Sequence, residues 1–143
     1  MDLGLTGRVA LVAAASKGLG KAVAREFARE GARVAIFSRD QQRIEQAARE
    51  IREETGAEVL ALTADARRAE DITRVFDETV RHFGQLDAVV TNAGGPPAGT
   101  FETLSEQDFI DAIELNLLST LRMCRAAVPH LKDRGGSIVT ITS

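Results

Sequence analysis

A glycine-rich segment near the start of the chain has the composition of a phosphate-binding loop. Residues 13–20 read A-A-A-S-K-G-L-G and lie between an apolar run and a helix-like pattern. Glycines at such a junction let backbone N–H groups approach a pyrophosphate, and the N-terminus of the following helix adds partial positive charge. The segment predicts a dinucleotide phosphate site, although a ligand-free turn has the same composition. The candidate residues are Ala14, Ser16, Lys17, Gly18, Leu19 and Gly20.

The residues after the second apolar run indicate which dinucleotide would bind. In dinucleotide-binding folds an acidic residue at this place holds the ribose 2′-hydroxyl and disfavours a 2′-phosphate. Here the place is taken by Ser38, followed by Arg39, and Lys17 precedes Gly18 in the first loop. Two cations and a hydroxyl suit a dianionic phosphate, so we expect NADP(H) rather than NAD(H). The alternative is that both cations are solvated surface charges.

Strand-like and helix-like patterns alternate along the chain in a regular order. Apolar runs predict strands at residues 8–13, 33–37, 59–63, 86–91 and 137–142. Helical periodicity fills the segments between them, and Gly31, Gly56 and Gly84 are expected to end the first three helices. Strands that alternate with single helices predict parallel βαβ units. The expected fold is therefore an α/β doubly wound parallel sheet, the Rossmann fold, in one domain over residues 1–143.

A longer helix is predicted before the fifth strand. Ser105, with Asp108 three residues later, has the pattern of a helix N-cap. The helix should end before Gly135, and Pro129 is expected to break or kink it. Its apolar residues form a band wider than one sheet face needs. Together with the family resemblance described below, this band implies a homo-oligomer, a dimer or tetramer built on the helix, although packing within one subunit is the alternative. The band comprises Phe109, Ala112, Ile113, Leu117, Leu118, Leu121 and Met123.

Composition excludes several other classes of function. The 143 residues carry a formal charge of −3 with both signs interspersed, so neither nucleic acid nor a membrane surface is an expected partner. No signal peptide or membrane-spanning run is recognised, and we expect a soluble, cytoplasmic protein. Cys124 is the only cysteine and is expected to be a small core residue. His82 and His130 are expected at the surface, and no metal site is predicted.

These motifs, taken in order, resemble the short-chain dehydrogenase/reductase family, and in particular its 3-oxoacyl-[acyl-carrier-protein] reductase-like members. The loop at 13–20 is similar to the family's T-G-x-x-x-G-x-G, N-A-G at 92–94 follows the fourth strand, and L-N-L surrounds Asn116. G-S-I-V-T-I-T-S at 136–143 resembles the strand that delivers the family's catalytic serine. The resemblance implies cofactor contacts from Asp65, Ala66, Asn92, Ala93 and Gly94, and catalytic roles for Asn116 and Ser143.

Each of these assignments has an ordinary structural alternative. The alternative for Asp65 is a turn residue that bonds its own backbone. The alternative for Asn116 is a helix residue bonded to the backbone, and the alternative for Ser143 is a strand-terminal serine. Pro96 and Pro97 are expected to stiffen their loop rather than to contact substrate. Ala13 and Ala14 replace the family's Thr and first Gly. Ala14 therefore implies either a turn with negative φ or a slightly displaced phosphate.

The resemblance implies hydride transfer between a nicotinamide and a small-molecule carbonyl or alcohol. In the family a tyrosine protonates the substrate oxygen, and a lysine lowers the pKa of that tyrosine. This Tyr and Lys follow the serine strand, whereas the 143 residues contain no tyrosine. We therefore expect the cofactor-binding half of an NADP(H)-dependent oxidoreductase. A non-catalytic dinucleotide-binding or sensing module is the alternative, and a methyltransferase would not explain N-A-G, L-N-L and the serine strand together.

Overall fold

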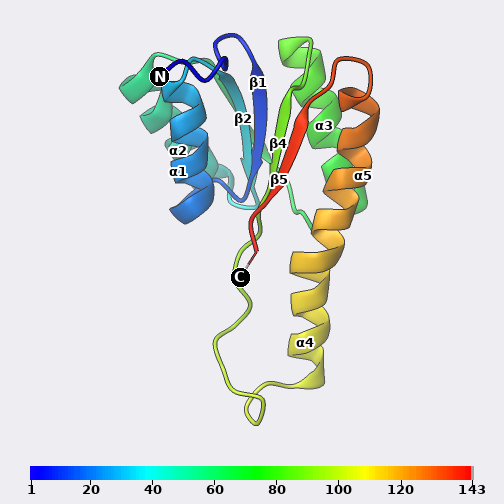
Figure 1. Cartoon of the computed structure of the whole chain (residues 1–143). Coiled ribbons are helices and arrows are strands. Elements are labelled where there is room, and N and C mark those ends of the chain that lie inside the picture. The colour runs from blue at the N-terminus through cyan, green and yellow to red at the C-terminus, as the bar shows by residue number, and fades with distance from the viewer. Residues whose placement is uncertain (143) are drawn as a thin grey trace.

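A five-stranded parallel sheet carries helices on both of its faces in the computed structural model, which describes residues 1–142 (Figure 1). The strands are β1 (Val9–Ala13), β2 (Arg33–Ser38), β3 (Val59–Thr63), β4 (Ala88–Thr91) and β5 (Ser137–Thr140). The helices are α1 (Gly18–Arg29), α2 (Gln41–Thr55), α3 (Ala69–Phe83), α4 (Glu106–Ile113), the π-helix η1 (Glu114–Leu118) and α5 (Ser119–Leu131). The strand order is β3-β2-β1-β4-β5, which confirms the expected doubly wound fold.

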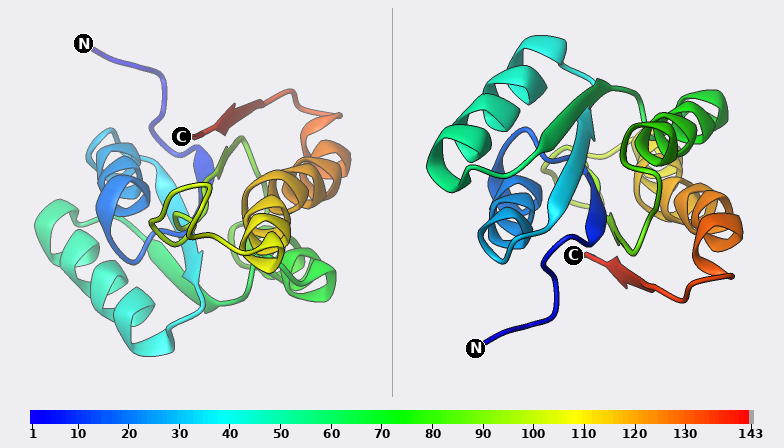
Figure 2. Two further views of the ribbon diagram at one scale, coloured as in Figure 1. Left: turned by 90° about the horizontal axis from the view of Figure 1, so that it is seen from below. Right: turned by 90° about the horizontal axis from the view of Figure 1, so that it is seen from above.

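The order of strands reverses beside β1, and this reversal places the functional crevice. The chain runs from β1 outward through β2 to β3, and then returns to β4 on the other side of β1. Helices α1 and α2 therefore cover one face of the sheet, and α3 and α5 cover the other (Figure 2). In open α/β sheets the loops at such a switch point diverge and leave a crevice at the carboxyl ends of the strands.

Strand β1 lies at the centre of two apolar cores, and all five of its residues are buried. Leu11 faces the core formed with α3 and α5, where Phe76 and Met123 are also buried. Val12 faces the core formed with α1 and α2, which includes Ala24. A strand covered on both faces is expected to read as a continuous apolar run, as this one does.

The structure changes two details of the predicted long helix. Its N-terminus is confirmed, because Ser105 and Asp108 form a reciprocal capping box. The expected break at Pro129 was wrong, since α5 continues through this residue to Leu131. Pro129 removes the N–H that would bond the carbonyl of Arg125, and both residues are exposed, so water can satisfy that carbonyl. The interruption instead lies earlier, at the π-helix η1, which the apolar periodicity did not reveal.

A buried carboxylate joins the amino-terminal ends of the central strands. The Asp87 side chain is 9% exposed and accepts hydrogen bonds from the Val9 N–H at 2.8 Å and from Gln85 Nε2 at 2.7 Å. Arg8 and Arg134 form ion pairs with it at 3.4 and 3.7 Å. Burial acts to raise the pKa of Asp87, but these hydrogen bonds and charges outweigh burial and hold its pKa below the ordinary value.

We predict that Asp87→Asn lowers the free energy of unfolding by about 1.5–3 kcal/mol at pH 7, because a carboxylate accepts stronger hydrogen bonds than an amide. A carboxyl whose pKa is lowered by folding stabilises the protein above its unfolded pKa of about 3.9 and stops doing so as pH falls through the folded pKa. The difference between variant and wild type should therefore shrink below about pH 4. Urea unfolding of both proteins at several pH values measures this difference in the free energy of unfolding.

Asp77→Asn is the matched control, because Asp77 is exposed on α3 and forms no side-chain hydrogen bond or ion pair within residues 1–142. This variant should unfold like the wild type at each pH. An Asp87→Asn variant that is equally stable at pH 7, or whose deficit grows in acid, would contradict the role assigned to Asp87.

Candidate functional site

A groove of about 780 Å³ opens at the carboxyl ends of strands β1 to β4. Every residue predicted from the sequence to bind a cofactor lines it, with the exception of Gly20. The predicted residues in the lining are Ala14, Ser16, Lys17, Gly18, Leu19, Ser38, Arg39, Asp65, Ala66, Asn92, Ala93 and Gly94. The other lining residues were not among those predicted to bind a cofactor, and they are Phe37, Asp40, Arg43, Ala64, Gly95 and Leu115.

The first turn after β1 is held in a tight conformation by contacts beneath the groove. Ala14 has φ +50°, so the first of the two alternatives for this position, a turn with negative φ, was wrong, and the slightly displaced phosphate stays a prediction. The Asn92 side chain bonds this turn, since its Nδ2 donates to the carbonyls of Ala13 at 3.3 Å and Ala14 at 3.4 Å. A Cβ at Gly20 would lie 2.4 Å from the Ala14 oxygen and 2.9 Å from Asn92 Nδ2. Gly20 therefore acts by close packing beneath the loop rather than by lining the groove.

The N-terminus of α1 faces the groove without a side-chain cap from the described residues 1–142. The N-cap residue Lys17 makes no side-chain cap hydrogen bond, and the first turn carries no acidic residue. By contrast, α2 is capped by the Asp40 carboxylate and α4 by its Ser105 box. Uncapped N–H groups and the partial positive charge of a helix terminus favour an anion. The arrangement can accept a phosphate group.

The end of β2 presents positive charge to the same groove. Lys17 and Arg39 are exposed, and neither side chain forms a hydrogen bond or ion pair within residues 1–142. The nearby Asp40 carboxylate is engaged elsewhere, since it accepts from the Arg43 N–H at 3.0 Å and pairs with Arg43 Nε at 3.5 Å. Ser38 Oγ donates to the Asp40 carbonyl at 3.3 Å. The two cations thus remain available to an anionic ligand.

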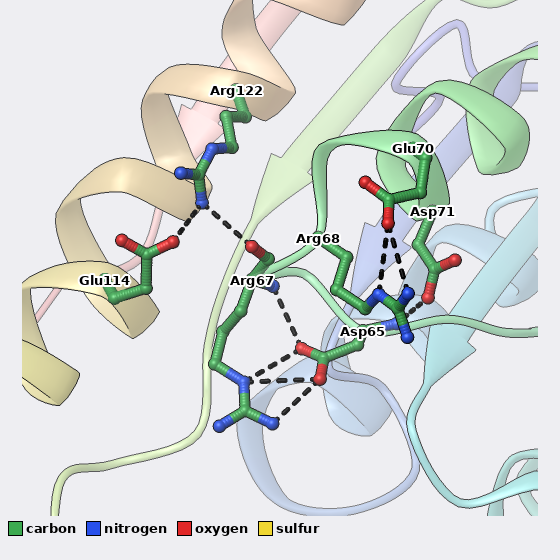
Figure 3. Close-up of polar contacts among 7 residues, drawn as sticks. All are labelled: Asp65, Arg67, Arg68, Glu70, Asp71, Glu114 and Arg122. Atoms are coloured by element: carbon green, nitrogen blue, oxygen red, sulfur yellow. Dashed lines mark hydrogen bonds and ion pairs between the residues drawn. The ribbon is translucent and has the colours of Figure 1, made fainter.

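At the end of β3, Asp65 is held by an arginine that the sequence analysis did not identify (Figure 3). Arg67 Nε and Nη2 bind the two carboxylate oxygens at 3.0 and 2.8 Å, and the Arg67 N–H donates to Oδ1 at 2.9 Å. The side-chain hydrogen bonds from Arg67 hold the pKa of Asp65 below its ordinary value, against the effect of burial. The backbone bond is the turn contact that we considered as the alternative, and the carboxylate also lines the groove.

Of the two predicted catalytic residues only Asn116 lies within the described residues, and it does not line the groove. Asn116 is exposed on η1, and its Nδ2 donates to the Ala112 carbonyl at 3.1 Å, which is the backbone contact considered as the alternative. Its neighbour Leu115 lines the groove, so η1 itself borders the site. Ser143 lies outside the described residues, immediately after Thr142.

The two histidines and the cysteine do not line the groove. His130 stacks on Phe76 with ring centroids 6.2 Å apart, and the exposed His82 lies edge-on to Phe83 at 4.7 Å. Cys124 is half-buried on α5. Within residues 1–142, no group of three or more His, Cys, Asp or Glu side chains lies close enough to hold a metal ion. No helix in the same range has the length and apolar character needed to cross a bilayer.

Comparison with known proteins tests whether these features mark membership of a protein family or occur together by coincidence. A family model described as short chain dehydrogenase matches residues 8–143. The chain belongs to the short-chain dehydrogenase/reductase family. Its members are oxidoreductases with a dinucleotide-binding fold, in agreement with the groove and the sheet topology described above.

The names of individual relatives refer to different substrates. An 11-beta-hydroxysteroid dehydrogenase-like 2 protein of Arabidopsis thaliana is 36% identical over 97% of this chain and 46% of its own length. The L-fucose dehydrogenase of Oryctolagus cuniculus is 38% identical over 96% of this chain and 47% of its own length. The chain therefore spans about half the length of the curated relatives that it matches.

Some solved structures that are similar to this chain contain a bound cofactor. An alcohol dehydrogenase from the archaeon Thermococcus sibiricus, complexed with 5-hydroxy-NADP, is 38% identical with a TM-score of 0.89 over 95% of this chain and 58% of that one. The L-sorbose reductase of Gluconobacter frateurii, complexed with NADPH and L-sorbose, is 33% identical with a TM-score of 0.91 over 98% of this chain and 54% of that one.

We predict that Ala14→Gly raises the free energy of unfolding by up to about 1 kcal/mol, because glycine adopts positive φ without the strain that a Cβ causes there. The greater freedom of glycine in the unfolded chain offsets part of this gain. Chemical denaturation measures the difference. Ala13→Gly is the matched control, since its φ is not positive, and it should destabilise the protein. Destabilisation by both substitutions would contradict the strain assigned to Ala14.

Proposed function

We propose that this chain forms the NADP(H)-binding part of an oxidoreductase that interconverts a carbonyl and an alcohol by hydride transfer. The observation that carries the proposal is the pair of free cations, Lys17 and Arg39, beside an uncapped helix terminus in one groove. In this proposal residues 1–143 are the dinucleotide-binding part of a longer domain. The relatives that the chain matches support this, because it covers 46–47% of their length.

The residues present fit such a cofactor. A pyrophosphate needs backbone donors and close approach, and the α1 terminus offers both because Gly20 leaves no Cβ between the helix and the Ala14 carbonyl. A 2′-phosphate needs cations without competing carboxylates, and Asp40 is already engaged by Arg43 and the α2 terminus. The related structures from Thermococcus sibiricus and Gluconobacter frateurii are complexed with 5-hydroxy-NADP and NADPH, which supports the same choice here.

Each region of the groove has a proposed task. Lys17, Ser38 and Arg39 bind the 2′-phosphate, and the amides from Ser16 to Gly20 bind the pyrophosphate. Asp65 and Ala66 bind the adenine, and Asn92, Ala93 and Gly94 border the path toward the nicotinamide. When bound, the nicotinamide supplies or accepts the hydride.

At the substrate end we propose that Asn116 holds a water for proton relay and that Ser143 bonds the substrate oxygen. The amide group of Asn116 is already committed to Ala112, which leaves Oδ1 as an acceptor for that water. These 143 residues contain no tyrosine, so the acid for the substrate oxygen is assigned to no residue of this chain.

The alternative function is dinucleotide binding or sensing without chemistry. The substrate stays open in either case, because relatives of similar identity carry names that refer to steroids, fucose and sorbose. The similarity to 3-oxoacyl-[acyl-carrier-protein] reductase-like members and the cytoplasmic location both stay predictions from the sequence.

We predict that the chain binds NADPH more tightly than NADH by roughly 10²–10⁴, since each charge-assisted bond to the 2′-phosphate contributes about 1.5–3 kcal/mol. Arg39→Asp should reduce this preference at least about tenfold through repulsion of the phosphate. Calorimetric titration of both cofactors measures it. Arg49→Asp, which makes the same charge change on the exposed side of α2, is the control and should keep the preference. Equal affinities in the wild type would refute the assignment of Lys17 and Arg39.

We further propose that the intact protein assembles as a dimer or tetramer through the apolar band on α4, η1 and α5. Phe109, Ile113, Leu117 and Leu121 recur at every fourth position and remain 43–55% exposed. Such a stripe can pair with its own copy about a two-fold axis. The packing of these residues within one subunit is the competing explanation.

We predict that light scattering gives the mass of a dimer or tetramer, and that Leu117→Glu shifts it toward the monomer by placing charges against each other in the interface. Ala22→Glu, an exposed position on α1 far from the band in sequence, should leave the mass unchanged. A monodisperse monomer at micromolar concentration, or an oligomer that survives Leu117→Glu, rules this interface out.

A further inference from the structure

The π-helix that carries Asn116 lies outside both apolar cores. None of the residues of α4 or η1 is buried, whereas α5 places Met123, Ala127 and Leu131 in the core. The position of η1 relative to the cofactor groove therefore depends on few contacts. A segment of this kind moves at lower free-energy cost than a core helix. Any contact that fixes the position of η1 relative to the groove therefore also fixes the position of Asn116.

Arg122 makes the polar contacts that fix this segment (Figure 3). Its Nη1 donates to Glu114 Oε1 at 2.6 Å, which holds the first residue of η1. The same atom donates to the Arg67 carbonyl at 2.9 Å, in the loop after β3. Arg122 and Glu114 are only 31% and 35% exposed, so solvent weakens this pair less than it weakens a surface pair.

The carbonyl that accepts from Arg122 belongs to Arg67, whose side chain also binds Asp65. Arg67 binds both oxygens of that carboxylate, and the Asp65 N–H donates to Asp71 Oδ2 at 2.8 Å on α3. Asp65 and Ala66 line the groove. One guanidinium therefore connects the loop that borders the groove at Asp65 to the π-helix at Glu114.

No second polar contact joins these three helices to the rest of residues 1–142. Apart from their caps at Ser105 and Lys132, helices α4, η1 and α5 share no hydrogen bond or ion pair with any other part of residues 1–142 except the bond from Arg122 to the Arg67 carbonyl. We propose that Arg122 is a positioning residue that couples occupancy of the adenine end of the groove to the placement of Asn116. The coupling rests on the proposed function, because it requires that the groove bind an adenine nucleotide.

The chain offers a direct reporter of this coupling, because Asn92 and Asn116 are its only asparagines. Selective ¹⁵N-asparagine labelling of the 143-residue chain gives one side-chain amide signal pair from each. Adenosine 2′,5′-bisphosphate is the probe, since it carries the adenine and the 2′-phosphate and lacks the nicotinamide. In the wild type we expect the Asn116 side-chain signal to shift in proportion to the binding measured by calorimetry.

Arg122→Ala should reduce the Asn116 shift by at least about half while the affinity for the probe changes by less than about threefold. Glu114→Ala, which removes the same connection from the other end, should have the same effect. Arg122→Lys keeps a cationic donor and should restore part of the response. Arg125→Ala is the control, because Arg125 is exposed on the same helix and its side chain makes no polar contact within residues 1–142.

Hydrogen exchange without ligand gives a second measurement. The N–H groups of Asp65, Arg67 and Arg68 are hydrogen-bonded in this loop, and in Arg122→Ala they should exchange about tenfold faster. An Asn116 signal that does not respond in the wild type, or that shifts as much in Arg122→Ala and Glu114→Ala as in the wild type, overturns the coupling while the binding proposal stands. Absence of probe binding by the wild type overturns the proposed function, and the coupling with it.

Discussion

Helix α1 approaches the end of strand β1 more closely than any side chain at position 20 would permit. The space that a Cβ at Gly20 would need is occupied by the Ala14 carbonyl and by the Asn92 amide. Asn92 in turn binds the carbonyls of Ala13 and Ala14, so the first and fourth strands are fixed to the same turn. The N-terminus of α1, which has no side-chain cap within residues 1–142, borders the groove beside this contact, and Ala14 in the same turn adopts a conformation that glycine adopts more easily.

The distribution of charge around the groove follows from which carboxylates already have partners. Asp40 caps a helix and pairs with Arg43, and Asp65 is held by Arg67, so neither presents a free negative charge beside Lys17 and Arg39. On the opposite end of the sheet Asp87 binds the strands together and keeps its charge away from the site. The sheet thus carries a structural carboxylate at its amino-terminal end and an anion-accepting groove at its carboxyl end.

Local patterns in the sequence predict those parts of the fold that depend on neighbours in the chain. Gly56 and Gly84 end their helices at positive φ, and Ser105 caps its helix, because each feature is decided within one turn. The positive φ of Ala14 was not predicted, and the Asn92 side chain that bonds this turn lies far along the chain. The bond from Arg122 to Arg67 joins residues 55 positions apart, and no pattern marks it. Asn116 was recognised from a family motif, whereas its bond to Ala112 needed the structure.

The most direct test of the account is a crystal structure of the chain grown with NADPH. The account predicts the pyrophosphate against the backbone N–H groups at the start of α1, and the 2′-phosphate within hydrogen-bonding distance of Lys17 or Arg39. A nucleotide bound outside this groove, or one whose 2′-phosphate points into solvent away from both cations, would contradict the central claim that these residues form an NADP(H) site.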